Sequence, residues 1–210
     1  MGVKERRERE KQELKQSILD AARQIASEDG WQAVTIRRVA EMIEYSPPTI
    51  YEYFESKDAI LVALVGEGFN ILFGRMRAAF DATTDPNLRM IKLALAYCDF
   101  AWDHQELYQV MHGLGGATCS ASDLPRTHDA QGIDSMLVAA IRDIFGAVEL
   151  DPDDLHAALD IHWATLHGIV SLTMSGHLAG GRERAAHLIE QSVRDWIVAW
   201  IVAWRDEEDT

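Results

Sequence analysis

The sequence is poor in cysteine and proline. Its only cysteines are Cys98 and Cys119, and neither lies in a C-x-x-C or other metal-ligand spacing. A reducing cytosol would leave both as thiols, so we expect two unreactive side chains and no metal site built on them. The chain also has only five prolines in 210 residues. Its helical patterns therefore have few interruptions.

Long apolar runs are absent as well. No stretch reaches the roughly eighteen uninterrupted apolar residues that a membrane span needs. The first ten residues, Met-Gly-Val-Lys-Glu-Arg-Arg-Glu-Arg-Glu, contain no apolar core for a signal peptide. These two absences predict a cytoplasmic protein that has no membrane partner.

Positive charge is scarce in relation to negative charge. The chain carries 20 Lys and Arg against 34 Asp and Glu, a formal net charge of −14, whereas nucleic-acid-binding domains are usually basic. Residues 1–60 hold ten cations and twelve anions, a balance of −2, and residues 61–210 hold ten and twenty-two, a balance of −12. The acidity therefore belongs mostly to the second part, which would repel DNA and suppress non-specific association.

Residues 35–54 contain two short helical patterns separated by a turn. Ile36, Val39, Ala40 and Ile43 form one apolar stripe, which Thr35 can cap, and Ile50 and Phe54 form a second. Between them, residues 44–46 allow only a tight turn, and Pro47-Pro48 fits a turn or the first turn of a helix. Two small helices joined in this way are a helix-turn-helix.

The second helical pattern has a polar outward face. With Ile50 and Phe54 turned inward, Thr49, Glu52 and Tyr53 share the other side. In a recognition helix such side chains reach base edges in the major groove, while the preceding helix crosses the phosphate backbone. The alternative is an αα-corner that only packs inside a larger bundle.

Several short stretches in and around this segment form a recognisable combination. They are Ile18-Leu19-Asp20-Ala21-Ala22, Gly30-Trp31, Thr35-Ile36, Val39-Ala40, residues 46–54 and Ser56-Lys57-Asp58. Together they resemble the TetR family of bacterial transcriptional regulators. Residues 163–172 also resemble one subtype of the C-terminal domain of that family. One position departs from the family, which commonly has glycine where this chain has Glu44.

The resemblance implies a three-helix DNA-binding head, followed by a helical body for ligand binding and dimerisation. We place the head at residues 1–60 and the body at 61–210. A local cationic and polar face, with support from helix N-termini, can contact phosphates even where the average charge is negative. The residues expected to contact DNA are Thr35, Arg37, Arg38, Ser46, Pro47, Pro48, Thr49, Tyr51, Glu52, Tyr53 and Lys57.

The remaining patterns predict an all-α fold, because no alternating strand pattern is present. Helices are expected at residues 58–81, 87–104, 133–146, 153–178 and 182–206, with a loose Gly-rich connection at 113–132. Residues 4–16 have mixed charge and predict a solvated extension of the first helix, with an arm that contacts DNA as the alternative.

The last helical pattern predicts a dimer surface. Residues 197–204 are apolar on all sides, and Trp196, Trp200 and Trp204 recur every four residues. A helix that is apolar all round must be buried all round. One side would pack on its own body and the other on a second copy, while Gly168 and Gly176 on the preceding helix would allow close approach. The alternative is a monomer with a thick core.

No enzyme motif is present. The chain has eight histidines, but no H-E-x-x-H, G-x-S-x-G or G-x-x-x-x-G-K, and no paired Glu-x-x-His motifs for a di-metal bundle. We therefore expect no catalytic residue, no metal ligand and no cofactor. A helical adaptor that binds only protein is the other class to consider, although it would leave the Thr49, Glu52 and Tyr53 face unused.

The resemblance also implies a small-molecule site in the body. Trp102, Tyr108, Met111 and His112 combine aromatic, soft and polar groups beside the Gly-rich residues 113–116. Ordinary core packing is the alternative for all four. Asp99, Asp103 and Glu106 share a helical face that would favour a cationic ligand or simply face solvent.

Together these observations predict a homodimeric DNA-binding regulator. The expected partners are a pseudo-palindromic double-stranded operator, a second copy of the chain and a small-molecule effector of unknown identity. Repression relieved by the effector is the favoured mode of action, and an activator without an inducer is the alternative.

Overall fold

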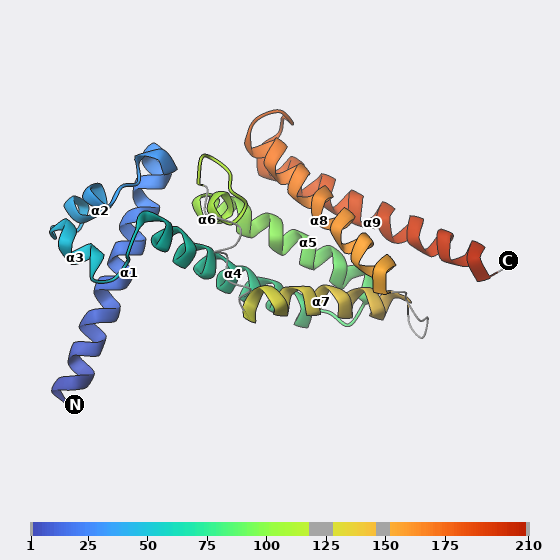
Figure 1. Cartoon of the computed structure of the whole chain (residues 1–210). Coiled ribbons are helices and arrows are strands. Elements are labelled where there is room, and N and C mark those ends of the chain that lie inside the picture. Colours follow the sequence, from blue (N-terminus) through green and yellow to red (C-terminus); the bar gives the residue numbers. More distant parts are fainter. Residues whose placement is uncertain (1, 118–127, 146–151, 209–210) are drawn as a thin grey trace. The chain divides into compact units, whose positions relative to one another are not determined.

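The computed structural model describes residues 2–117, 128–145 and 152–208 (Figure 1). Within these ranges the regular structure is entirely helical, which confirms the predicted all-α class. The helices are α1 (Val3–Asp29), the 3-10 turn η1 (Trp31–Ala33), α2 (Ile36–Met42), α3 (Pro47–Tyr51), α4 (Lys57–Asp81), α5 (Pro86–Asp103), α6 (Gln105–Met111), α7 (His128–Phe145), α8 (Pro152–Met174) and α9 (Gly181–Glu208).

The chain forms two compact units. The N-terminal unit comprises Met1–Phe69 and His104–Arg126, and the C-terminal unit comprises Asn70–Asp103 and Thr127–Thr210. Helix α4 is continuous and contributes its first part to one unit and its second part to the other. The division of function after residue 60 remains a prediction.

In the N-terminal unit, α1 contributes one long apolar stripe. Ile18, Ala22 and Ile25 are fully buried, and α1 contacts η1, α2 and α6. Residues 4–13 of α1 are helical and exposed, as expected for a solvated extension. The helix ends at Gly30, whose positive φ of 80° would strain another residue and whose N–H donates to the Ala26 carbonyl at 3.0 Å.

In the C-terminal unit, α5 is the central helix. It packs against α7, α8 and α9, and α8 packs in turn against α7 and α9. Met90, Leu93, Tyr97 and Phe100 of α5 are buried at helical spacing. This arrangement is a helical bundle around one apolar core.

Three helix predictions are wrong in detail. Helix α6 was not predicted; it begins after the irregular backbone of His104 and buries Leu107 and Val110. Helix α7 starts at His128 instead of residue 133, and α8 ends at Met174 instead of 178. Gly132 therefore lies inside α7, where an added Cβ would stand 2.5 Å from the Phe73 ring. The glycine allows close packing and does not mark a loop.

Helix α4 is long and apolar enough, by length and composition alone, to cross a membrane. Polar residues such as Glu67 and Asn70 interrupt its apolar run, so the sequence criterion of an uninterrupted run excludes it. Leu61 and Leu64 are buried in the N-terminal unit, and Leu72 and Met76 are buried in the C-terminal unit. These side chains belong to the protein cores, which is the usual reason for such a helix in a globular fold.

Candidate functional site

The helix-turn-helix forms as the residues predict. Thr35 caps α2 by accepting a hydrogen bond from the Arg38 backbone N–H at 3.2 Å, and Val39 and Ala40 of α2 are buried. Pro47 opens α3 at a position where its missing N–H costs nothing. Ile50 and Phe54 are buried, so the opposite side of α3 is presented outward.

The turn before α3 contains a left-handed residue. Glu44 has a φ of 60°, and it is the only non-glycine residue with positive φ among those the structure describes. The Tyr45 N–H donates to the Ala40 carbonyl at 2.9 Å and the Glu44 N–H to the Glu41 carbonyl at 3.3 Å. This is a Schellman ending, in which glycine is the usual residue at the left-handed position. A glutamate there costs on the order of 1–2 kcal/mol.

The outward surface around α3 is polar and aromatic. Ser46, Pro47, Pro48 and Glu52 are exposed, and Tyr51 is 55% exposed. The Ser46 and Thr49 hydroxyls lie 3.0 Å apart, and Thr49 is half-buried.

Helix α3 is shorter than the predicted recognition face. It ends at Tyr51, so Glu52 and Tyr53 lie in the following turn. Their N–H groups still donate to the carbonyls of Thr49 and Ile50, at 3.2 and 3.0 Å. The turn thus extends the helical path far enough to keep both residues beside α3.

The predicted cations of this surface already have partners within the chain. The Arg37 Nε lies 2.8 Å from Glu41 on the exposed side of α2, and Arg38 forms an ion pair with Asp29. Lys57 is half-buried, and its ammonium donates to the Trp31 carbonyl at 2.8 Å. The bond from Lys57 fastens the start of α4 to η1, a structural role that the sequence pattern did not suggest.

Helix α6 is held inside the N-terminal unit by an ion triad. Arg23 of α1 lies 2.6 Å from Glu67 of α4 and 2.8 Å from Glu106 of α6. After α6, the Gly116 carbonyl accepts a hydrogen bond from the Gln32 side chain at 3.2 Å. Three helices and η1 are therefore tied together by polar contacts.

Three of the four residues predicted to bind an effector pack within this unit. Tyr108 is fully buried with its ring centroid 4.7 Å from that of His112. Met111 is buried against Gly68, where an added Cβ would stand 2.4 Å from the Met111 sulfur. Trp102 belongs to α5 of the C-terminal unit. The burial of Tyr108 and Met111 is that of ordinary core residues.

A cavity lies in the C-terminal unit between α4, α5, α7 and α8. Its volume is about 20 Å³, and none of the four predicted residues lines it. The lining is apolar apart from Tyr97, His162 and the indole of Trp163. The sequence pattern suggested no role for His162, and no local signal pointed to the cavity, because its walls come from four separate helices.

The polar atoms around the cavity are neutral. His162 is 4% exposed, its Nε2 has no hydrogen-bond partner, and burial lowers its pKa to about 4. The Tyr97 hydroxyl lies 3.3 Å from Nδ1 of His167, whose pKa is also lowered by burial. At neutral pH the cavity therefore presents uncharged polar groups.

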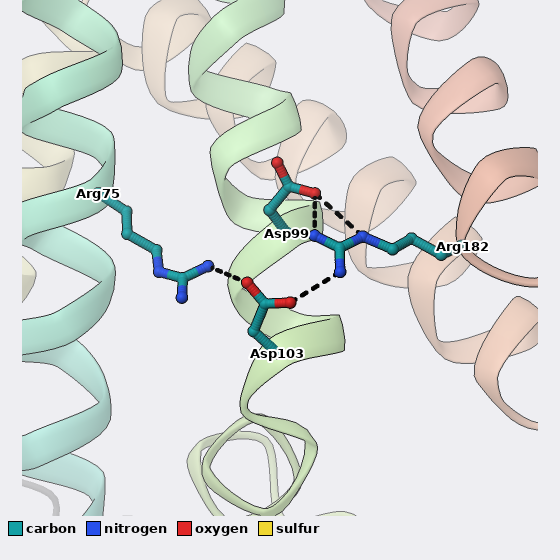
Figure 2. A network of polar contacts seen from close by, with 4 residues as sticks. All are labelled: Arg75, Asp99, Asp103 and Arg182. Atoms are coloured by element: carbon teal, nitrogen blue, oxygen red, sulfur yellow. Dashed lines mark hydrogen bonds and ion pairs between the residues drawn. The ribbon is translucent and has the colours of Figure 1, made fainter.

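The acidic face of α5 is neutralised by arginines of the same chain. Figure 2 shows Arg182 bridging Asp99 and Asp103 at 2.6 and 2.7 Å, with Arg75 on the other Asp103 oxygen at 2.7 Å. The hydrogen bond from Arg75 is the main reason that the pKa of Asp103 is lowered. Since Glu106 pairs with Arg23, the predicted stripe for a cationic ligand is a set of internal ion pairs.

Among residues 2–117, 128–145 and 152–208, no group of three or more His, Cys, Asp or Glu side chains could hold a metal ion. Cys98 is a buried free thiol whose pKa is raised to about 11, mainly by burial. Such a thiol is unreactive at neutral pH. Cys119 lies outside the described residues.

Family comparisons match both parts of the chain. Residues 18–64 match the bacterial regulatory proteins of the tetR family, and residues 90–196, about half of the chain, match the tetracyclin repressor-like C-terminal domain. The first match covers the helix-turn-helix. The second covers most of α5, all of α6, α7 and α8, and the first part of α9.

Individual relatives agree with these matches. The HTH-type transcriptional repressor KstR of Mycolicibacterium smegmatis is 37% identical over 90 residues, which are 43% of this chain and 42% of that repressor. The match thus spans less than half of the length of that relative. An uncharacterised HTH-type transcriptional regulator of Mycobacterium tuberculosis, Rv0681, is 26% identical over 171 residues, covering 77% of this chain and 71% of the relative.

Solved structures show the same fold at lower identity. A protein of unknown function from Rhodococcus sp. RHA1 superposes with a TM-score of 0.73 at 24% identity, covering 89% of this chain and 94% of that one. The TetR-family regulator PfmR of Thermus thermophilus gives a TM-score of 0.65 at 18% identity, covering 86% and 96%. With its helix-turn-helix and its helical C-terminal domain both matched, this chain belongs to the TetR family of DNA-binding transcriptional regulators, which are not enzymes.

Proposed function

We propose that the protein is a cytoplasmic, homodimeric repressor that leaves its operator when a small molecule binds the C-terminal unit. The observation that carries the proposal is the exposed, polar surface of α3, held outward by the buried Ile50 and Phe54. In this proposal residues 1–60 bind DNA, and residues 61–210 bind the effector and the second copy.

The exposed residues of the helix-turn-helix suggest how the protein docks on DNA. The start of α3, with Ser46, Pro47, Pro48 and Thr49, enters the major groove, and α2 crosses the backbone. Glu52 is exposed and can accept a hydrogen bond from cytosine N4, which would favour cytosine at one position. The other residues assigned to the interface are Thr35, Arg37, Arg38, Tyr51, Tyr53 and Lys57.

Arg37 and Arg38 can exchange their carboxylate partners for phosphates. Arg37 is well exposed, so this exchange has little desolvation cost. Lys57 contributes chiefly by orienting α4, because its ammonium is bound to the Trp31 carbonyl.

Apolar side chains on the outside of α8 and α9 support the homodimer. Ile161 is 61% exposed, Leu172 is 46% exposed, and an added Cβ at Gly168 would meet no atom within 4 Å. Spacings of seven and eleven residues place all three on one face of α8. Val198 of α9 is 61% exposed, while the neighbouring Ile197 is buried. A second copy would cover this apolar surface.

The all-apolar segment 197–204 is described only in part. Trp196 packs on His162 of α8 with ring centroids 5.2 Å apart, and Trp200 lies 5.5 Å from Trp196. The side chains of residues 201–204, including Trp204, lie outside the described residues. The contribution of that end to the dimer therefore remains a prediction.

The cavity between α4, α5, α7 and α8 is the effector site that we favour. Helix α4 lines it through Met76 and begins at the DNA-binding unit, so the bound effector can act on the head through α4. To move the protein from almost fully DNA-competent to almost fully incompetent, the effector must prefer the incompetent form by about 10⁴-fold. By reciprocity, operator DNA must weaken effector binding by the same factor. Trp102, Tyr108, Met111 and His112 remain an untested second candidate.

Selection of DNA from a random pool by the purified protein tests the proposal. We expect a pseudo-palindrome whose half-sites lie roughly 34–36 Å apart, or a multiple of that distance, because two heads read successive major grooves. Glu52→Ala should relax the preference at one base position. If no sequence is enriched, the protein-only adaptor becomes the better explanation.

A further inference from the structure

The cavity of the C-terminal unit is lined by a histidine, His162, whose Nε2 has no hydrogen-bond partner. We propose that this cavity binds an uncharged, largely apolar molecule through a hydroxyl or carbonyl oxygen that bonds to Nε2 of His162. The inference rests on the proposed function, since it concerns the same site, and it specifies the chemical class of the effector.

His162 is built into the wall of the cavity. It lies on α8, it is 4% exposed, and its Nε2 has no hydrogen-bond partner. The Trp196 ring packs beside it at 5.2 Å between centroids. A buried nitrogen without a hydrogen-bond partner is destabilising, so a ligand that supplies the missing bond gains free energy there.

The charge of the site excludes ionic ligands. No side chain that lines the cavity carries a formal charge at neutral pH, since the pKa of His162 is lowered to about 4. A carboxylate or an ammonium group would lose its hydration without gaining a counter-ion. An uncharged oxygen avoids this cost.

The neutral form of the His162 imidazole further restricts which ligand groups can bond to it. A neutral imidazole has one donor nitrogen and one acceptor nitrogen. A hydroxyl therefore fits either tautomer of His162, and a carbonyl fits the tautomer with the proton on Nε2.

The cavity is too small for such a molecule without a side-chain movement. A volume of about 20 Å³ holds little more than one water molecule. Trp163 lines the cavity and is also 37% exposed, so this residue borders both the cavity and solvent. Its ring centroid is 5.2 Å from that of Tyr97. Displacement of the Trp163 indole would enlarge the cavity and open it from the solvent side.

Three compounds with one alkyl chain test the inference: 1-octanol, octanoate and octylammonium. Their affinities for the full-length protein at pH 7.5 can be measured by tryptophan fluorescence and calorimetry. We expect 1-octanol to bind at least about tenfold more tightly than either ion, because only the ions lose hydration of a charge. In ¹⁵N-histidine-labelled protein, 1-octanol should shift the Nε2 resonance of His162.

Variants of His162 separate the hydrogen bond from the apolar contact. His162→Leu should weaken 1-octanol binding by roughly 3–10-fold, the effect of one neutral hydrogen bond, and should leave octylammonium unchanged. His162→Gln, which keeps a donor and an acceptor, should recover most of the loss. His177→Leu, at an exposed histidine beyond the end of α8, is the matched control and should have no effect.

The inference is overturned if either ion binds as tightly as 1-octanol, if His162→Leu and His162→Gln both retain full affinity, or if none of the three compounds binds. Operator release is measured separately by fluorescence anisotropy. If 1-octanol binds at His162 without releasing DNA, the inference stands and the proposed release fails. If a charged compound alone binds and releases DNA, the repressor proposal stands and the ligand class is wrong.

Discussion

The two units of the protein use polar side chains in different ways. In the N-terminal unit polar groups fix the backbone: Thr35 caps α2, Ser56 caps α4, and Lys57 binds the Trp31 carbonyl. In the C-terminal unit the ion pairs of Arg182 with Asp99 and Asp103 lie on the exposed edge of α5, while the interior holds a neutral histidine without a partner on Nε2. Buried polar atoms without a partner occur in both units, for example Nε1 of Trp31 in the N-terminal unit, but His162 is the one that lines the apolar cavity.

The largest expected effect comes from a charge placed on the exposed apolar surface of the C-terminal unit. Ile161→Asp should weaken dimerisation by more than about 100-fold, or roughly 3 kcal/mol, because a carboxylate would be buried without a partner. Ile161 is exposed in the single chain, so the fold should survive. Leu88→Asp, at an exposed leucine of α5, is the control. If both variants sediment as dimers, α8 is not part of the dimer interface.

The next effect tests the dependence of the N-terminal unit on its ion triad. Arg23→Met keeps much of the apolar stem but leaves Glu67 and Glu106 partly buried together, and should lower the free energy of unfolding by about 2 kcal/mol. Arg6→Met breaks only an exposed pair within α1 and should change stability by less than about 0.5 kcal/mol. Urea denaturation measures both. If both variants lose a similar free energy of unfolding, the ion triad does not stabilise the N-terminal unit.

A pH effect of similar size tests the unpaired histidine. The pKa of His162 is about 4 in the folded protein, against 6.5 for an unburied histidine, so the unfolded chain binds more protons between these values. Stability should fall as pH drops below 6.5, by about 2 kcal/mol at pH 5 relative to pH 8. His162→Leu should lose this part of the pH dependence in thermal unfolding. An unchanged profile would mean that the imidazole is not buried in the neutral form.

A smaller effect tests the exposed surface of the head. Tyr51→Ala should weaken binding to all DNA sequences alike by about 1 kcal/mol, the value of one hydrogen bond. Tyr51→Phe, which removes only the hydroxyl, distinguishes that bond from contact of the ring. Fluorescence anisotropy with operator and unrelated DNA measures both variants.

The salt dependence of DNA binding distinguishes two cations of the head. Arg37→Ala should flatten the salt slope by roughly 1, as expected for one phosphate contact. Lys57→Ala should change the slope less, because Lys57 is engaged with Trp31. A larger slope change for Lys57 would show that it leaves the Trp31 carbonyl in the complex.

The smallest effect concerns the one strained position in the head. Glu44→Gly should stabilise the protein by roughly 0.5–1 kcal/mol, because glycine adopts the positive φ without steric cost but loses more backbone entropy on folding. The variant should keep its operator affinity, since Glu44 is not assigned to DNA. Destabilisation would show that the glutamate side chain supports the turn in another way.

The sequence by itself determined the helical class, the helix-turn-helix and the family. The first two conclusions depend on local signals: the apolar spacing of α2 and α3, the cap at Thr35 and the stop at Gly30, all of which act within a few residues. The family follows from the short stretches of sequence that resemble it. Even the departure at Glu44 could be recognised in the sequence, because the family that the chain resembles commonly has glycine at that position.

Only the tertiary structure decided which distant residues meet. The α5 carboxylates share a face that would suit a cationic ligand, but Arg182, 83 residues after Asp99, pairs with them (Figure 2). The cavity around His162 takes its walls from four helices, and α6 is stabilised by contacts with α1 and α4. Helical periodicity shows which side chains share a face, but the crossing of helices determines what that face contacts. For this reason the helix-turn-helix was predictable from the residues, whereas the chemistry of the effector cavity was not.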